Sequence, residues 1–181
     1  MAYHIDDKLR VNLFYPESIS LYELLHSEGD TNLKKLLNQE SVQTRKRIKY
    51  EIAFQLAKIM LTIHSLDSIH HHGHLTSHNI FVTINKVGSG TFEVVVKISD
   101  IETIDFMEYG NMFFNYRLAS VWSSPEILSN TKKLPALNQG MDIYSFGMII
   151  WEIWHQSLPF DGDINSAQEY VVKEESRPKI I

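Results

Sequence analysis

The sequence predicts a mainly helical α+β fold with one small β-hairpin. Apolar residues recur at helical spacing through residues 41–66, which indicates a long amphipathic helix. Two runs rich in β-branched residues, "IFVTI" and "FEVVVKI", flank a short segment with two glycines and indicate the hairpin. A further segment, "DIYSFGMIIWEIW", is apolar on almost every side, as is typical of a helix enclosed within a domain. With 181 residues, 44% of them hydrophobic, the chain can form one domain with a substantial core.

The first predicted elements are short. "KLRVNLFYP" is rich in strand-forming residues and ends at Pro16, which predicts one strand. Ser20 is the predicted N-cap of a short helix that ends before Gly29. In the long helix over 41–66, the residues expected to face the core are Ile48, Ile52, Leu56, either Ile59 or Met60, and Ile63.

The remaining elements are the hairpin, a loop and two helices. Gly88 and Gly90 suit a hairpin loop over "NKVGSGT". A long irregular segment from Asp100 to about Pro125 follows, and loops of this length in compact domains tend to be functional. The enclosed helix at 142–154 and a weaker amphipathic helix over "INSAQEYVVKEES" complete the order.

Charge and composition exclude several classes of protein. The net charge is −5, from 17 Lys and Arg against 22 Asp and Glu, and no basic stripe is present, so a nucleic-acid partner is not expected. The absence of cysteine excludes disulfides and thiolate metal sites. The amino terminus lacks the apolar region of a signal peptide, and "FGMIIWEIW" is short and contains Glu152, so no membrane segment is predicted. An intracellular, cytoplasmic protein is expected.

The stretch "HHHGHLTSHNIFV" at residues 70–82 has two interpretations. In the first, its histidines bind zinc, which requires three or four imidazoles that converge tetrahedrally. In the second, it is a phosphoryl-transfer loop whose catalytic residue has been replaced. The five histidines are His70, His71, His72, His74 and His78.

Five motifs in a fixed order favour the second interpretation. They are "HGHLTSHN" at 72–79, "ISD" at 98–100, "SSPE" at 123–126, "DIYSFGMIIWEI" at 142–153 and "LPF" at 158–160. On this framework they resemble the carboxyl-terminal lobe of the protein kinase family, of the tyrosine-kinase-like or tyrosine kinase type. The resemblance covers residues 1–181 as a single partial domain, from the hinge, "NLFYPESISLYELLH", to about the family's helix G.

The resemblance assigns roles to residues of the loop. His74 stands where the family pattern H-R-D-L-x-x-x-N has its catalytic aspartate, and Gly73 replaces the adjacent arginine. Asn79 and Asp100 match the asparagine and the D-F-G aspartate that hold magnesium against the phosphates, although the triplet here reads D-I-E. A neutral imidazole can accept a proton but lacks the negative charge, and a positioned base contributes roughly 10²- to 10⁴-fold.

Structural interpretations remain open for the same residues. Asn79 and Asp100 could be loop residues whose polar groups are satisfied without a metal. Phe81 matches an apolar residue that contacts adenine in the family, but a core contact would explain it equally well. The resemblance implies that His72 packs inward and that Asp142 caps the enclosed helix and holds the loop backbone.

Parts of the family pattern are missing. Before its hinge the family has a Gly-rich loop over the phosphates and a strand lysine, whereas about 11 residues precede "NLFYP" here and none forms that loop. The closing "SRPKII" resembles the family's R-P motif, after which two further helices would follow. The chain thus looks truncated at both ends, with the amino-terminal lobe absent.

We therefore expect a catalytically inactive pseudokinase that acts as a protein-interaction module. ATP and magnesium are the cofactors that the resemblance implies, and neither is expected to bind tightly. The expected partner is a protein that covers the apolar surface around Phe81, where the amino-terminal lobe would lie. The alternative is an active protein kinase that transfers phosphate from ATP to Ser, Thr or Tyr, of which this chain is a fragment.

Overall fold

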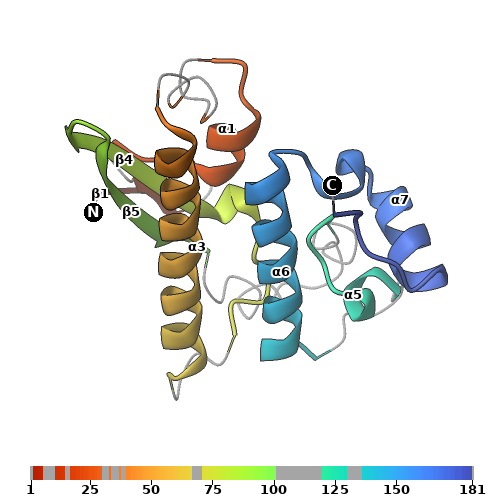
Figure 1. The fold of residues 1–181 in the computed structure, drawn as a ribbon. Coiled ribbons are helices and arrows are strands. Elements are labelled where there is room, and N and C mark those ends of the chain that lie inside the picture. The colour runs from red at the N-terminus through yellow and green to blue at the C-terminus, as the bar shows by residue number, and fades with distance from the viewer. Residues whose placement is uncertain are drawn as a thin grey trace.

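Two small antiparallel sheets lie beside a group of helices in the computed structural model of the chain (Figure 1). The structure describes residues 2–5, 11–14, 17–29, 33, 37, 40–66, 71–100, 120–129 and 136–180. Strand β1 (Ala2–Ile5) pairs with β2 (Val11–Phe14), and a second sheet has the order β3 (Ile19–Ser20), β4 (Ile80–Gly88) and β5 (Thr91–Ile98). The mainly helical α+β class is confirmed, and β2 lies in the segment predicted as a strand, whereas β1 and β3 were not predicted.

The β4–β5 hairpin is confirmed, with a tighter turn than the sequence suggested. The strands pair from Ile80 opposite Ile98 to Gly88 opposite Thr91, with an irregularity between Lys86 and Gly88. Most of the segment "NKVGSGT" is therefore strand, and only residues 89–90 form the turn. The Lys86 ammonium lies 5.6 Å from the ring centroid of Phe92, a cross-strand contact that favours the longer pairing.

The long helix α3 (Val42–His64) forms the centre of the core. Its N-cap is Ser41, whose hydroxyl accepts the Thr44 N–H at 3.0 Å. Figure 1 shows α3 crossing the sheet beside α6. The core positions are those predicted, and Met60 rather than Ile59 takes the ambiguous one. The buried side chains are Ile48, Ile52, Leu56, Met60 and Ile63.

Helices α1 (Leu21–His26) and α6 (Gln139–His155) pack around α3 and the loop that follows it. Ser20 caps α1 as predicted, because its hydroxyl accepts the Glu23 N–H at 3.1 Å. The predicted cap of α6 is wrong. The helix begins three residues before Asp142, and the Asn138 side chain accepts the N–H groups of its first turn at 2.9 and 3.3 Å.

The carboxyl-terminal part contains short elements. Helix α5 (Pro125–Ser129) follows the segment predicted as irregular, of which residues 101–119 lie outside the described ranges. After a 3-10 turn, η2 (Pro159–Gly162), the predicted last helix is found as α7 (Ile164–Gln168) continued by a π turn, η3 (Glu169–Lys173). Among the described segments, no helix combines the length and apolar character needed to span a membrane.

Candidate functional site

One buried carboxylate holds the loop of residues 71–79 in place. Asp142 on α6 is 1% exposed and accepts the His72 N–H at its Oδ2 (2.7 Å) and the Gly73 N–H at its Oδ1 (2.9 Å). The Nε2 atom of His64, at the end of α3, lies 2.9 Å from the same Oδ2. Because charge-assisted bonds to backbone N–H groups are strong, α6 fixes the path of the loop. The predicted role of Asp142 in holding this backbone is confirmed.

His72 is a buried structural histidine, as predicted, with 1% of its surface exposed. Its Nε2 lies 2.9 Å from the Ser99 carbonyl oxygen, and its Nδ1 accepts the His74 N–H at 3.3 Å. A carbonyl can only accept a hydrogen bond, so Nε2 carries the proton and the imidazole is neutral. Burial lowers the pKa of His72, and the bond to Ser99 and the charges of Asp142 and Asp100 oppose this shift without cancelling it.

His74 is also held as a neutral imidazole. Burial lowers its pKa, the neighbouring His72 lowers it further, and the carboxylate of Asp100 opposes the shift. The side chain is only partly covered, so the ring keeps some contact with solvent. Between these two histidines, Gly73 has a φ of 83°, a left-handed conformation that residues with a Cβ adopt only with strain.

Asn79 and Asp100 lie at the open end of the β4–β5 hairpin. Asn79 ends the 3-10 turn η1 (Ser77–Asn79) just before β4, and its carbonyl accepts the N–H of Ser99, which follows β5, at 2.9 Å. The Asn79 Nδ2 donates to the His74 carbonyl at 2.9 Å, which leaves the side-chain oxygen for a cation. Asp100 is exposed and has a φ of 60°. An amide oxygen and a carboxylate are ligands that Mg²⁺ accepts, so these residues fit the metal by type.

Phe81 lies on the side of the sheet that faces away from the core. It is half-buried on β4, opposite Ser20 of β3 and Lys97 of β5. Its neighbours Ile80 and Val82 are 0% and 1% exposed, and side chains alternate between the two faces of a strand. The structure therefore separates Phe81 from the core cluster formed by its neighbours.

The histidines of the stretch point in different directions. His72 turns inward to Ser99, whereas the exposed His78 stacks on Tyr22 with 4.0 Å between ring centroids and meets Trp122 edge-on at 5.7 Å. In the parts of the chain that the structure describes, no three His, Asp or Glu side chains are arranged to hold a metal ion. His70 lies outside those parts.

Comparison with known proteins identifies the family. The family model described as "Protein tyrosine and serine/threonine kinase" matches residues 16–180. The chain belongs to the protein kinase family. The relationship predicted from the five ordered motifs is therefore confirmed.

The relatives of this kinase-family chain are much longer proteins. It is 31% identical over 130 residues to cyclic GMP-binding protein C of Dictyostelium discoideum, and the match covers 72% of this chain and 5% of that protein. It is 29% identical over 122 residues to receptor-type guanylate cyclase gcy-28 of Caenorhabditis elegans, and the match covers 67% of this chain and 9% of that protein. It is 28% identical over 152 residues to serine/threonine-protein kinase CTR1 of Arabidopsis thaliana, and the match covers 82% of this chain and 16% of that protein. The chain thus spans 16% or less of the length of each of these three relatives.

A second buried carboxylate of the kinase-family domain was not predicted as part of the site. Glu152 on α6 is 0% exposed and accepts the Ser77 hydroxyl at 2.8 Å and the Trp122 indole N–H at 2.6 Å. The Nε2 atom of His26, at the end of α1, lies 2.7 Å from the same carboxylate. Glu152 therefore joins α6 to the loop, to the segment before α5 and to α1. A lone glutamate within the otherwise apolar "FGMIIWEIW" is the sequence signal that indicates such a role, because acidic residues are rarely buried unless paired.

Proposed function

We propose that this chain is a catalytically inactive protein kinase domain, a pseudokinase that acts through interaction rather than phosphoryl transfer. The observation that carries the proposal is a histidine, His74, at the position where the family has a carboxylate. The family's aspartate supplies a negative charge and accepts the proton of the substrate hydroxyl. His74 offers a lone pair without the charge, and loss of a positioned base costs roughly 10²- to 10⁴-fold in rate.

The cofactors that the kinase family uses are ATP and magnesium, and Asn79 and Asp100 are the residues that would hold the metal here. When bound, magnesium neutralises charge on the phosphates. Asn79 also donates to the His74 carbonyl, so it supports the loop whether or not a nucleotide is present. Retained metal ligands without the catalytic carboxylate favour weak nucleotide binding without turnover.

The proposed partner is a protein that covers the sheet face around Phe81. This side chain is half-buried on the face opposite the core, and exposed apolar surface commonly marks interaction sites. Two relatives have names that do not refer to phosphoryl transfer, a cyclic GMP-binding protein and a guanylate cyclase. Their names support a kinase-family domain that serves a larger protein.

The second candidate function is an active protein kinase that transfers phosphate from ATP to Ser, Thr or Tyr. Retention of Asn79 and Asp100 favours it, and so do relatives named as kinases. One is dual specificity protein kinase pyk3 of Dictyostelium discoideum, 27% identical over 168 residues, which covers 92% of this chain and 10% of that protein. His74 would then be the base, because a neutral imidazole can accept a proton.

An assay with radiolabelled ATP and mixed peptide substrates distinguishes the two functions. We expect no incorporation by the unmodified chain above that of a variant with Asn79→Ala and Asp100→Ala. Incorporation that disappears in His74→Gln would establish the active kinase instead. We also expect no recovery from His74→Asp combined with Gly73→Arg, because the sequence has no Gly-rich loop or strand lysine before "NLFYP" to hold the transferred group in line. Transfer by that double variant would show that the phosphates are held and that only the base is missing.

A further inference from the structure

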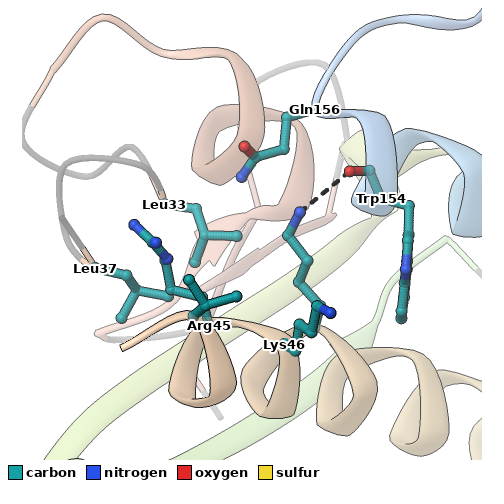
Figure 2. A pocket seen from close by; sticks show the side chains of 8 residues that line it. Leu33, Leu37, Arg45, Lys46, Trp154 and Gln156 are labelled. Atoms are coloured by element: carbon teal, nitrogen blue, oxygen red, sulfur yellow. Dashed lines mark hydrogen bonds between the residues drawn. The ribbon is translucent and has the colours of Figure 1, made fainter. Parts of the chain in front are cut away.

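We propose that a pocket at the first turns of α3 binds a small organic anion, a phosphate or carboxylate carried on an apolar body. The pocket has a volume of about 360 Å³ and lies between the beginning of α3, the end of α6 and residues 33 and 37 (Figure 2). Pockets that bind small molecules usually have roughly 300–1,000 Å³. The loop with His74 and Asn79 follows the opposite end of α3, so this site is separate from the kinase-family site and does not depend on the function proposed for it.

The pocket is apolar on two opposite sides. Leu33 and Leu37, each 1% exposed, form one side, and Trp154 of α6, 38% exposed, forms the other. Figure 2 shows them facing each other across the space, with Arg45 and Lys46 of α3 between them. The two leucines are enclosed, so an apolar or aromatic ligand body would mainly contact the Trp154 indole and Val42, which is 54% exposed.

Three cations line the same space, namely Arg45, Lys46 and Lys49. The Lys49 ammonium donates to the Trp154 carbonyl at 3.1 Å, drawn as the dashed line in Figure 2, which places its charge beside the apolar side. The ion pairs between described residues join other side chains, and no described carboxylate pairs with Arg45 or Lys46. The segment "RKRIK" at 45–49 thus concentrates four of the chain's 17 basic residues in a protein of net charge −5.

The position of these cations is electrostatically unfavourable for the helix itself. The first turns of a helix carry partial positive charge and favour anions, yet the first turn of α3 contains no acidic residue. Arg45 lies in that first turn and Lys46 follows it, so two cations stand at the end of the helix that favours anions. A bound anion offsets this arrangement, and the apolar sides receive the rest of the ligand. The combination favours an organic anion over an inorganic ion.

Calorimetric titration of the chain with naphthyl phosphate tests the proposal. Naphthaleneacetate carries a carboxylate on the same body, inorganic phosphate lacks the body, and naphthalenemethanol lacks the charge. We expect saturable binding of naphthyl phosphate, naphthaleneacetate or both, and binding at least about tenfold weaker for the two incomplete probes. The comparison of the first two probes shows which anionic group the site prefers.

Arg45→Gln and Arg47→Gln form a matched pair of variants, because both remove one guanidinium from α3 and Arg47 lines a different hollow. Arg45→Gln should weaken binding by about tenfold, and Arg47→Gln by no more than about twofold. Thermal unfolding shows whether both variants fold, and the shift of the Trp154 indole N–H signal in the unmodified chain locates the ligand independently. An equal loss in both variants, equal binding of inorganic phosphate, or no binding of either organic anion would each overturn the proposal.

Discussion

The Ser77 hydroxyl donates a hydrogen bond of 2.8 Å to the Glu152 carboxylate in the interior of the domain. This bond ties the loop that ends at Asn79 to α6, and the same carboxylate accepts the Trp122 indole N–H. Because both oxygens of a carboxylate accept hydrogen bonds, one such group can satisfy several buried donors together. A change at Glu152 is therefore expected to disturb several elements at once.

Glu152→Gln should lower the free energy of unfolding by about 1–3 kcal/mol for each buried donor, of Ser77 or Trp122, that is left without an acceptor. The amide would direct its own N–H groups toward the donors of Ser77 or Trp122. Urea unfolding monitored by tryptophan fluorescence measures the effect. Glu174→Gln changes an exposed carboxylate and should alter the free energy by no more than about 0.5 kcal/mol. Similar values for the two variants would mean that the Glu152 bonds contribute no net stability.

Asp142→Asn should act locally on the loop. The amide leaves one of the two backbone N–H groups, of His72 or Gly73, without an acceptor, at a cost of about 1–3 kcal/mol. Amide hydrogen exchange should accelerate at these two residues more than at Ile52, which lies in the core of α3. Uniform acceleration at all three amides would indicate instead that the substitution weakens the whole fold.

The helices and the hairpin could be predicted because their signals are local. Ser20 and Ser41 cap the helices that follow them, and the spacing from Ile48 to Ile63 defines one face of α3. Strand β3 has no such signal, since its two residues become a strand only by pairing with Val82 and Phe81 of β4. A short element of this kind depends on a partner far along the chain, which no local pattern reveals.

The grouping of the candidate site residues could be predicted from the sequence, but the buried contacts that support them could not. Motif order placed His74, Asn79 and Asp100 together, and the structure brings them to one end of the hairpin. The partners of Glu152 lie in segments far apart in sequence, and only packing brings them together. The start of α6 was misplaced because Asp142 and Asn138 are both suitable cap residues, and the sequence does not show which of them reaches the first-turn amides.

The free energy of unfolding should decrease as the pH falls below about 6.5. Burial holds the pKa values of His72 and His74 below the ordinary value of 6.5, so between their folded pKa values and pH 6.5 the unfolded chain binds more protons than the folded chain. The stabilisation that comes from keeping these imidazoles neutral is complete above about pH 6.5. It is lost as the pH falls toward the pKa of the folded chain, by at most about 1.4 kcal/mol per pH unit for each buried histidine.

The variant His72→Gln keeps a side-chain donor for the Ser99 carbonyl but cannot titrate. Its free energy of unfolding, measured in urea at about pH 7.5, 6.5 and 5.5, should depend less steeply on pH than that of the unmodified chain. An equally steep dependence in the variant would assign the effect to other groups.

ATP–magnesium should bind this chain in the millimolar range or more weakly, at about −4 kcal/mol. Asn79 and Asp100 are the proposed metal ligands, but residues 1–11 do not match the loop and lysine that hold the phosphates in the family. Calorimetric titration measures the affinity, and Asp100→Asn should abolish what binding there is. Micromolar affinity would contradict the expectation.

The backbone at Gly73 sets a conformational cost for any residue with a Cβ at this position. With φ at 83°, an arginine there would have to adopt a left-handed conformation, at a cost of about 1–2 kcal/mol. Glycine adopts this conformation without a steric penalty and lacks the side chain that the family pattern has at this position. The substitution Gly73→Arg would introduce the strain and, on its own, would leave His74 at the position of the aspartate. The path of this backbone and the family's catalytic pattern therefore make opposite demands on one residue.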